Sequence, residues 1–125
     1  MNKKKWIGFS GIILILFVFS IILWGYNHNI INGDYSKITI MKDGNVIEII
    51  DDQKEVNLIV DQINNSPRSF HTEGGWKYDY LEHVILSFEG DEEKHLVGVP
   101  IKLGNVVTKY WEIETEFDFI KEMAN

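Results

Sequence analysis

The stretch from His71 to Tyr80, HTEGGWKYDY, holds the densest set of residues that could do chemistry. It contains a histidine, two acids, a glycine pair and three aromatic residues. A metal site here would need several of five polar side chains to converge: His71, Glu73, Asp79, Glu82 and His83. The spacings typical of zinc sites, H-x-x-x-H and H-E-x-x-H, do not occur among them. We therefore expect neither a metal nor another cofactor.

Catalytic motifs are also missing from the sequence. The chain has no cysteine and no G-x-S-x-G, and no serine stands with a histidine in a recognisable context. Two acids can meet in space as an acid–base pair, but nothing in the sequence selects which two. The sequence predicts that the protein is not an enzyme. An envelope hydrolase or a metal-dependent enzyme is the alternative from a different functional class.

Aromatic residues in and around residues 71–80 indicate a surface for contact with a partner rather than a site of chemistry. Tryptophan and tyrosine are enriched among the anchor residues of protein interfaces, and Gly74-Gly75 allows a loop to fold back with positive φ. The alternative is that these rings cover the edge and core of a sheet. The candidate residues for contact with a partner are Phe70, Trp76, Tyr78, Tyr80 and Tyr110.

An uncharged apolar segment occupies residues 6–26, WIGFSGIILILFVFSIILWGY. A helix of that length rises about 31 Å, close to the ~30 Å hydrocarbon core of a bilayer. Trp6 at one end, and Trp24 and Tyr26 at the other, stand where interfacial aromatic residues belong. The segment predicts a transmembrane anchor rather than a buried core helix, because core helices rarely have only apolar residues on every face.

Three lysines stand directly before this segment: Lys3, Lys4 and Lys5. The excess of positive charge makes residues 1–5 a cytoplasmic basic tip and places the rest of the chain outside the cell. A cleavable signal peptide has a similar basic start, but its apolar core is usually about 7–15 residues and ends in a small-x-small site. A cut after Gly25 would put Leu23 at a small-residue position. We expect a signal anchor that stays in the cell membrane, with cleavage as the alternative.

The part of the chain after residue 33 is strongly acidic. It keeps nine of the 12 Lys and Arg residues and all 19 Asp and Glu residues, so its net charge is −10, against −7 for the whole chain. A surface of this charge repels phosphates, which argues against a nucleic-acid partner. The absence of cysteine excludes disulfides and a lipidated cysteine, and suits a Gram-positive cell envelope.

Hydrophobic patterns after residue 35 predict one extracytoplasmic domain over residues 36–125, joined to the anchor by a polar tether over 27–35. Its first two strands are connected at Asp43-Gly44, a strong hairpin signal. A helix follows, in which Asp52 is the predicted N-cap and Glu55 its reciprocal partner.

The second half of the domain has the pattern of three further strands and a helix. The sequence EHVILSFEGDEEKHLVGVPIK predicts two strands around a polar turn at 89–93, the second at an edge or bulged because of Pro100. VVTKYWEI predicts one more strand, and Thr115 is the expected cap of the last helix. The predicted fold is α+β: a small antiparallel sheet in the order β-β-α-β-β-β-α, with both helices on one face.

Three stretches of this domain, DDQKEVNLIVDQINNSPRS, VILSFEGDEEKHLVGVPI and KYWEIETEFDFIKEM, resemble the YhfM-like domain of small anchored proteins and lipoproteins of Gram-positive bacteria. The likeness covers residues 37–123 and rests on layout more than on invariant motifs. It implies an extracytoplasmic α+β domain and carries no catalytic residues to this chain. The chain departs from the pattern in lacking the lipobox cysteine.

The sequence therefore predicts a single-pass protein of the cell membrane that displays a small acidic domain outside the cell. Its expected partners are the lipid bilayer, through residues 6–26, and a protein or peptide of the envelope that the domain binds or modulates. An immunity protein that neutralises a secreted peptide toxin is an alternative of the same broad kind.

Overall fold

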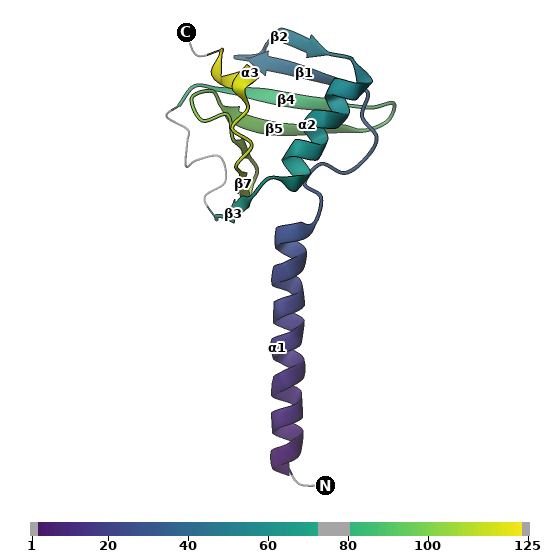
Figure 1. Ribbon diagram of the computed structural model, residues 1–125, viewed down its shortest axis with the longest axis vertical. Coiled ribbons are helices and arrows are strands. Elements are labelled where there is room, and N and C mark those ends of the chain that lie inside the picture. The colour runs from purple at the N-terminus through teal and green to yellow at the C-terminus, as the bar shows by residue number, and fades with distance from the viewer. Residues whose placement is uncertain (1–2, 73–80, 124–125) are drawn as a thin grey trace.

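The structure is a computed structural model that describes residues 3–72 and 81–123. A long apolar helix comes first, and an antiparallel sheet flanked by shorter helices follows it, which is an α+β arrangement (Figure 1). Most of the long helix extends away from the sheet domain, and the domain stands on the C-terminal end of the helix.

The first helix, α1, covers Lys3–Asn27 and includes all of the predicted segment 6–26. Its mean hydropathy reaches 2.6 and none of its residues is buried against the protein. By length and composition it is the one helix among the described residues that is able to cross a membrane.

The described part of the domain contains one sheet of seven antiparallel strands in the order β2-β1-β4-β5-β6-β7-β3. Edge strand β2 and edge strand β3 are thus at opposite ends of the sheet. The elements are β1 (Lys37–Lys42), β2 (Asn45–Ile50), α2 (Gln53–Asn65), β3 (Arg68–Phe70), β4 (His83–Glu89), β5 (Lys94–Pro100), β6 (Val106–Val107), β7 (Trp111–Ile113) and α3 (Asp118–Lys121).

Two local predictions of the first half are confirmed, the turn at Asp43-Gly44 and Asp52 as the N-cap of the helix. Asp43 and Gly44 form the β1–β2 turn with φ of 52° and 81°, the conformation that a two-residue hairpin requires. Asp52 is the N-cap of α2, and its Oδ1 accepts a hydrogen bond from the Lys54 amide at 3.0 Å. Both features depend on neighbouring residues only, which is why the sequence predicts them.

The predicted strand count is wrong in the second half. VVTKYWEI is not one strand but the hairpin β6–β7, in which the Thr108 amide donates to the Trp111 carbonyl at 2.8 Å. The three residues of β3 pair with β7 and were not predicted as a strand. These strands are two or three residues long, too short to show an alternating pattern, and pairing across the sheet decides them.

Two predictions about single residues are also wrong. Pro100 lies in β5, which is an interior strand between β4 and β6. The Ile101 amide donates to Glu82 on the β4 side, so the Pro100 nitrogen faces the β6 side, where β5 is paired only at Gly98. Thr115 does not cap α3, which begins at Asp118 after Phe117.

Thr115 connects two turns instead. Its Oγ1 donates to the Gly104 carbonyl at 2.8 Å and accepts from the Val106 amide at 3.2 Å. The hydroxyl is buried and close to two backbone groups that need partners, so it satisfies them rather than a helix terminus.

The core lies between one face of the sheet and the helices α2 and α3 (Figure 1). Side chains of β1, β4 and β5 alternate in register toward this face, and α2 contributes the stripe that the sequence predicts. Phe117 and Ile120 from the C-terminal segment belong to the same cluster, so the last helix docks. The core residues shared by sheet and helices include Ile38, Ile40, Val56, Ile59, Ile63, Val84, Leu86, Phe88, Val97, Val99, Phe117 and Ile120.

Residues 27–35 pack against the domain. Ile31 is 2% exposed, and its amide and carbonyl are both bonded by the side chain of Asn64, at 2.9 and 3.1 Å. Tyr35 is buried and makes an edge contact with Phe88 at 6.0 Å. These contacts join the end of α1 to the core.

Candidate functional site

Within the described residues, one face of the sheet carries no helix. This face has exposed apolar side chains, and we call it the open face. Register places Ile49, Thr39, Ser87 and Leu96 in one row across β2, β1, β4 and β5. A second row contains Val46, Met41, Ile85 and Gly98. The large exposed side chains of these two rows are Val46, Ile49, Ile85 and Leu96.

The open face is apolar because of the strand pattern of β2. This strand has apolar residues at successive positions, and a bulge opposite Ile40 and Met41 shifts the register. Ile50 faces the core, whereas Val46, Ile47 and Ile49 are about half exposed. Contiguous apolar surface with polar groups at its margin is typical of a protein-interaction site.

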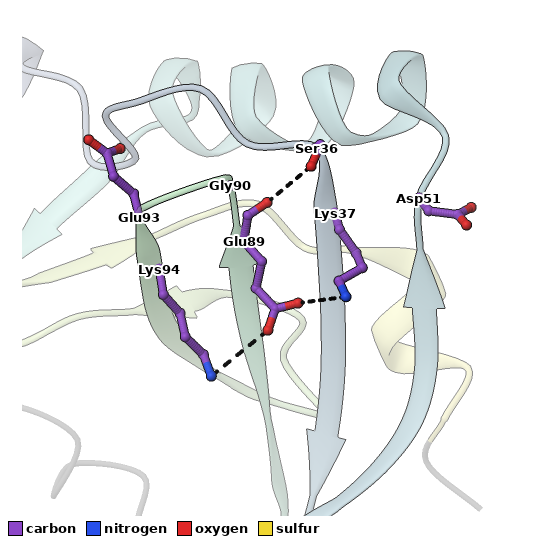
Figure 2. Close-up of a pocket in the computed structure, with 7 residues that line it drawn as sticks. All are labelled: Ser36, Lys37, Asp51, Glu89, Gly90, Glu93 and Lys94. Carbon is purple, nitrogen blue, oxygen red and sulfur yellow. Dashed lines mark hydrogen bonds and ion pairs between the residues drawn. The ribbon is translucent and has the colours of Figure 1, made fainter.

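A charged group lies at the margin of the open face. Glu89 on β4 is 3.3 Å from the Lys37 ammonium and 3.8 Å from that of Lys94 (Figure 2). Its Oε2 also accepts a hydrogen bond from the Thr39 hydroxyl at 2.8 Å. The hydrogen bond from Thr39, and after it the bond and charge of Lys37, lower the pKa of the Glu89 carboxyl against the opposing effect of burial.

The cavity at this group has a volume of about 590 Å³ and is lined by Ser36, Lys37, Asp51, Glu89, Gly90, Glu93 and Lys94. Both lysines are paired with Glu89, and Asp51 and Glu93 point away from that group (Figure 2). The lining therefore offers no concentrated charge of one sign, and we assign it no ligand.

A second surface lies where β3 and β7 meet the end of α1, and we call its rings the aromatic cluster: Phe70, Tyr110 and Trp111. Phe70 stacks on Tyr110 at 6.3 Å and meets Trp111 edge-on at 5.5 Å. Trp111 also contacts Tyr26 of α1 at 5.0 Å. Phe70 is 55% exposed and Tyr110 48% exposed, so two of the three rings reach solvent.

The aromatic cluster is attached to α1 through close backbone contacts. A Cβ atom on Gly25 would lie 3.2 Å from Cζ2 of Trp111, so glycine allows the ring to approach the helix. Arg68 donates from Nη1 to the Gly25 carbonyl at 3.3 Å and from Nη2 to the Asn64 carbonyl at 3.2 Å. One guanidinium thus binds the C-terminal ends of α1 and α2, where helix carbonyls lack partners and the dipole is negative.

The predicted contact residues have different outcomes. Phe70 and Tyr110, far apart in sequence, lie together in the aromatic cluster. Trp76, Tyr78 and Tyr80 lie outside the described residues. The role of Trp111 as the central ring was missed, because nothing in the local sequence shows that α1 ends beside it.

No metal site appears in the described ranges. There, no three His, Asp or Glu side chains come close enough to hold an ion. Of the five side chains considered as metal ligands from the sequence, three are among the described residues: His71, Glu82 and His83. Glu73 and Asp79 lie outside the described residues. His83 is exposed at the start of β4.

Comparisons of the chain with protein families, with curated proteins and with solved structures find no significant match. The likeness to the YhfM-like domain therefore stays a prediction from the sequence.

Proposed function

We propose that the protein is a single-pass membrane protein with its N-terminus in the cytoplasm, and that its domain binds a protein or peptide outside the cell through the open face. The observation that carries this proposal is the set of exposed apolar side chains on β2, β4 and β5, on the face opposite to both short helices of the described residues. An isolated exposed side chain needs no explanation, but four large exposed apolar side chains on one face of a sheet do.

The free edge of β2 suits the same role. As the terminal strand of the sheet it presents backbone groups that a partner strand can pair with, next to the half-exposed Val46, Ile47 and Ile49. The net charge of −10 after residue 33 favours a neutral or basic partner over an acidic one.

The anchor is supported by the length and hydropathy of α1 and by the three lysines before its apolar segment. Mass spectrometry of membranes from the native host should find peptides containing Lys3 to Lys5 on the full-length species. A mature N-terminus near Asn27 would show instead that the segment is removed.

The open face is tested by crosslinking in intact cells. A photo-reactive amino acid at Leu96, 55% exposed on β5, should give a discrete adduct with an envelope protein or peptide. The matched control is Leu58, 61% exposed on α2, which should give none. Equal adducts at both positions, or none at Leu96, would contradict the proposed surface.

Serine substitutions at the same two positions, Leu96 and Leu58, measure how much the open face contributes to binding. Leu96→Ser should weaken capture of the crosslinked partner at least about tenfold, since losing an apolar interface anchor costs more than about 1.4 kcal/mol. Leu58→Ser should leave capture unchanged, and neither substitution should lower the melting temperature strongly because both side chains are exposed.

A further inference from the structure

We infer that the aromatic cluster is a second membrane contact, which sits in the lipid headgroup layer beside α1 and keeps the domain on the bilayer surface in one orientation. The inference rests on the proposed span of α1. It adds a lipid-binding surface that is separate from the open face: β3 and β2 are the two opposite edges of the sheet.

The height of the cluster follows from its contacts with α1. The apolar segment ends at residue 26, and Trp24 and Tyr26 are its outer interfacial residues. Trp111 touches Gly25 and packs edge-on against Tyr26, so its ring lies at the level of the last turns of the helix. Phe70 is next to Trp111 and Tyr110 next to Phe70, which places all three rings near the outer membrane interface.

The exposed chemistry of the cluster fits this level. Phe70 and Tyr110 are about half exposed although each packs on another ring. The Lys109 ammonium lies 5.3 Å from the centre of the Tyr110 ring. Aromatic rings with a cation at their margin are favoured where one side is apolar and the other faces water and phosphate.

The domain is held in the position that this contact requires. Arg68 binds carbonyls of α1 and α2, and Asn64 binds both backbone groups of Ile31. The aromatic cluster therefore cannot swing away from α1 without breaking the bond from Arg68 to the Gly25 carbonyl. In Figure 1, β3 lies beside the upper end of α1 and β2 at the far side of the domain.

The absence of native cysteine allows a direct test with single labels on the full-length chain. Phe70→Cys, Tyr110→Cys, Trp24→Cys and Val46→Cys are each labelled with a small fluorophore and reconstituted in phosphatidylcholine vesicles. The vesicles contain a lipid with a nitroxide quencher on its headgroup. Val46 is the matched control because it is 55% exposed, as Phe70 is, but lies on β2, six strand spacings or roughly 29 Å away across the sheet.

Fluorescence at positions 70 and 110 should be lost to nearly the same extent as at position 24, and fluorescence at position 46 should be retained. Because the vesicles contain no other protein, such quenching reports lipid contact and not a protein partner. Quenching at 24 without quenching at 70 and 110 overturns the inference and leaves the anchor intact. No quenching at 24 contradicts the proposed span, and the lipid contact with it.

Discussion

At the scale of single residues, Glu89 is the clearest case of a side chain whose surroundings set its properties. It accepts a hydrogen bond from Thr39 and pairs with Lys37 and Lys94, and all of these favour its charged form. A carboxyl with a lowered pKa in the folded state stabilises the fold above its unfolded pKa of about 4.5. That stabilisation is lost as the pH falls through the folded value.

Glu89→Gln should therefore lower stability by about 1 kcal/mol at pH 7, a loss of roughly 4–8 °C in melting temperature for a domain of this size. The difference between variant and wild type should shrink as the pH is lowered from 5 to 3, where wild-type Glu89 becomes protonated. Thermal unfolding across that pH range measures it. The exposed Glu92→Gln is the charge-matched control; a loss independent of pH would show that the carboxylate is not the cause.

At the scale of elements, the C-terminal helix depends on contacts with a distant turn. A helix of four residues such as α3 is not stable alone. The Gly104 carbonyl accepts bonds from the Phe117 amide at 2.9 Å and from Thr115 Oγ1, and these fix the segment before α3. Gly104 has φ of +68°, and a Cβ there would lie 2.7 Å from the Phe117 nitrogen.

Gly104→Ala should destabilise the domain by about 2 kcal/mol or more, because it adds a steric clash to an unfavourable backbone conformation. The control is Gly98→Ala in β5, where a Cβ would meet only the Val107 carbonyl at 4.0 Å. Chemical denaturation of the two variants gives the comparison. Equal losses of stability in the two variants would mean that the contact between Gly104 and the segment at Phe117 contributes little to the stability of the domain.

At the scale of the whole molecule, one arginine couples the long apolar helix α1 to the domain. Neither α1 nor α2 has a basic residue in its own last turn, and Arg68, the single arginine of the chain, reaches carbonyls of both. Its guanidinium also lies over the Trp111 ring at 5.8 Å. Burial lowers the pKa of the Arg68 guanidinium, because the loss of hydration disfavours its charged form.

Arg68→Ala should cost about 1.5–3 kcal/mol of stability in detergent micelles, since charged donors to two partly buried carbonyls are removed. Arg68→Lys should recover only part of this, because an ammonium cannot reproduce the planar fork. The exposed Lys102→Ala controls for loss of a positive charge. A melting temperature of Arg68→Ala equal to that of the control would contradict the role of Arg68 at this junction.

The sequence by itself determined the features that depend on neighbours along the chain. These are the long apolar helix, the turn at Asp43-Gly44, the capped amphipathic α2 and the alternation in β4 and β5. Each follows from periodicity or from the backbone preferences of a few adjacent residues, which act in the same way whatever the rest of the fold does.

Only the tertiary structure decided which surfaces exist. The pairing of β3 with β7, the use of Thr115 between two turns, and the position of Phe70 beside Tyr110 and Trp111 all join residues that are not neighbours in sequence. The sequence predicts both helices on one face, but which side chains the open face presents also depends on the strand register and on the bulge between β1 and β2. Such contacts depend on how whole elements pack, and the alternating pattern of a strand is the same whether its exposed side meets water, lipid or a partner.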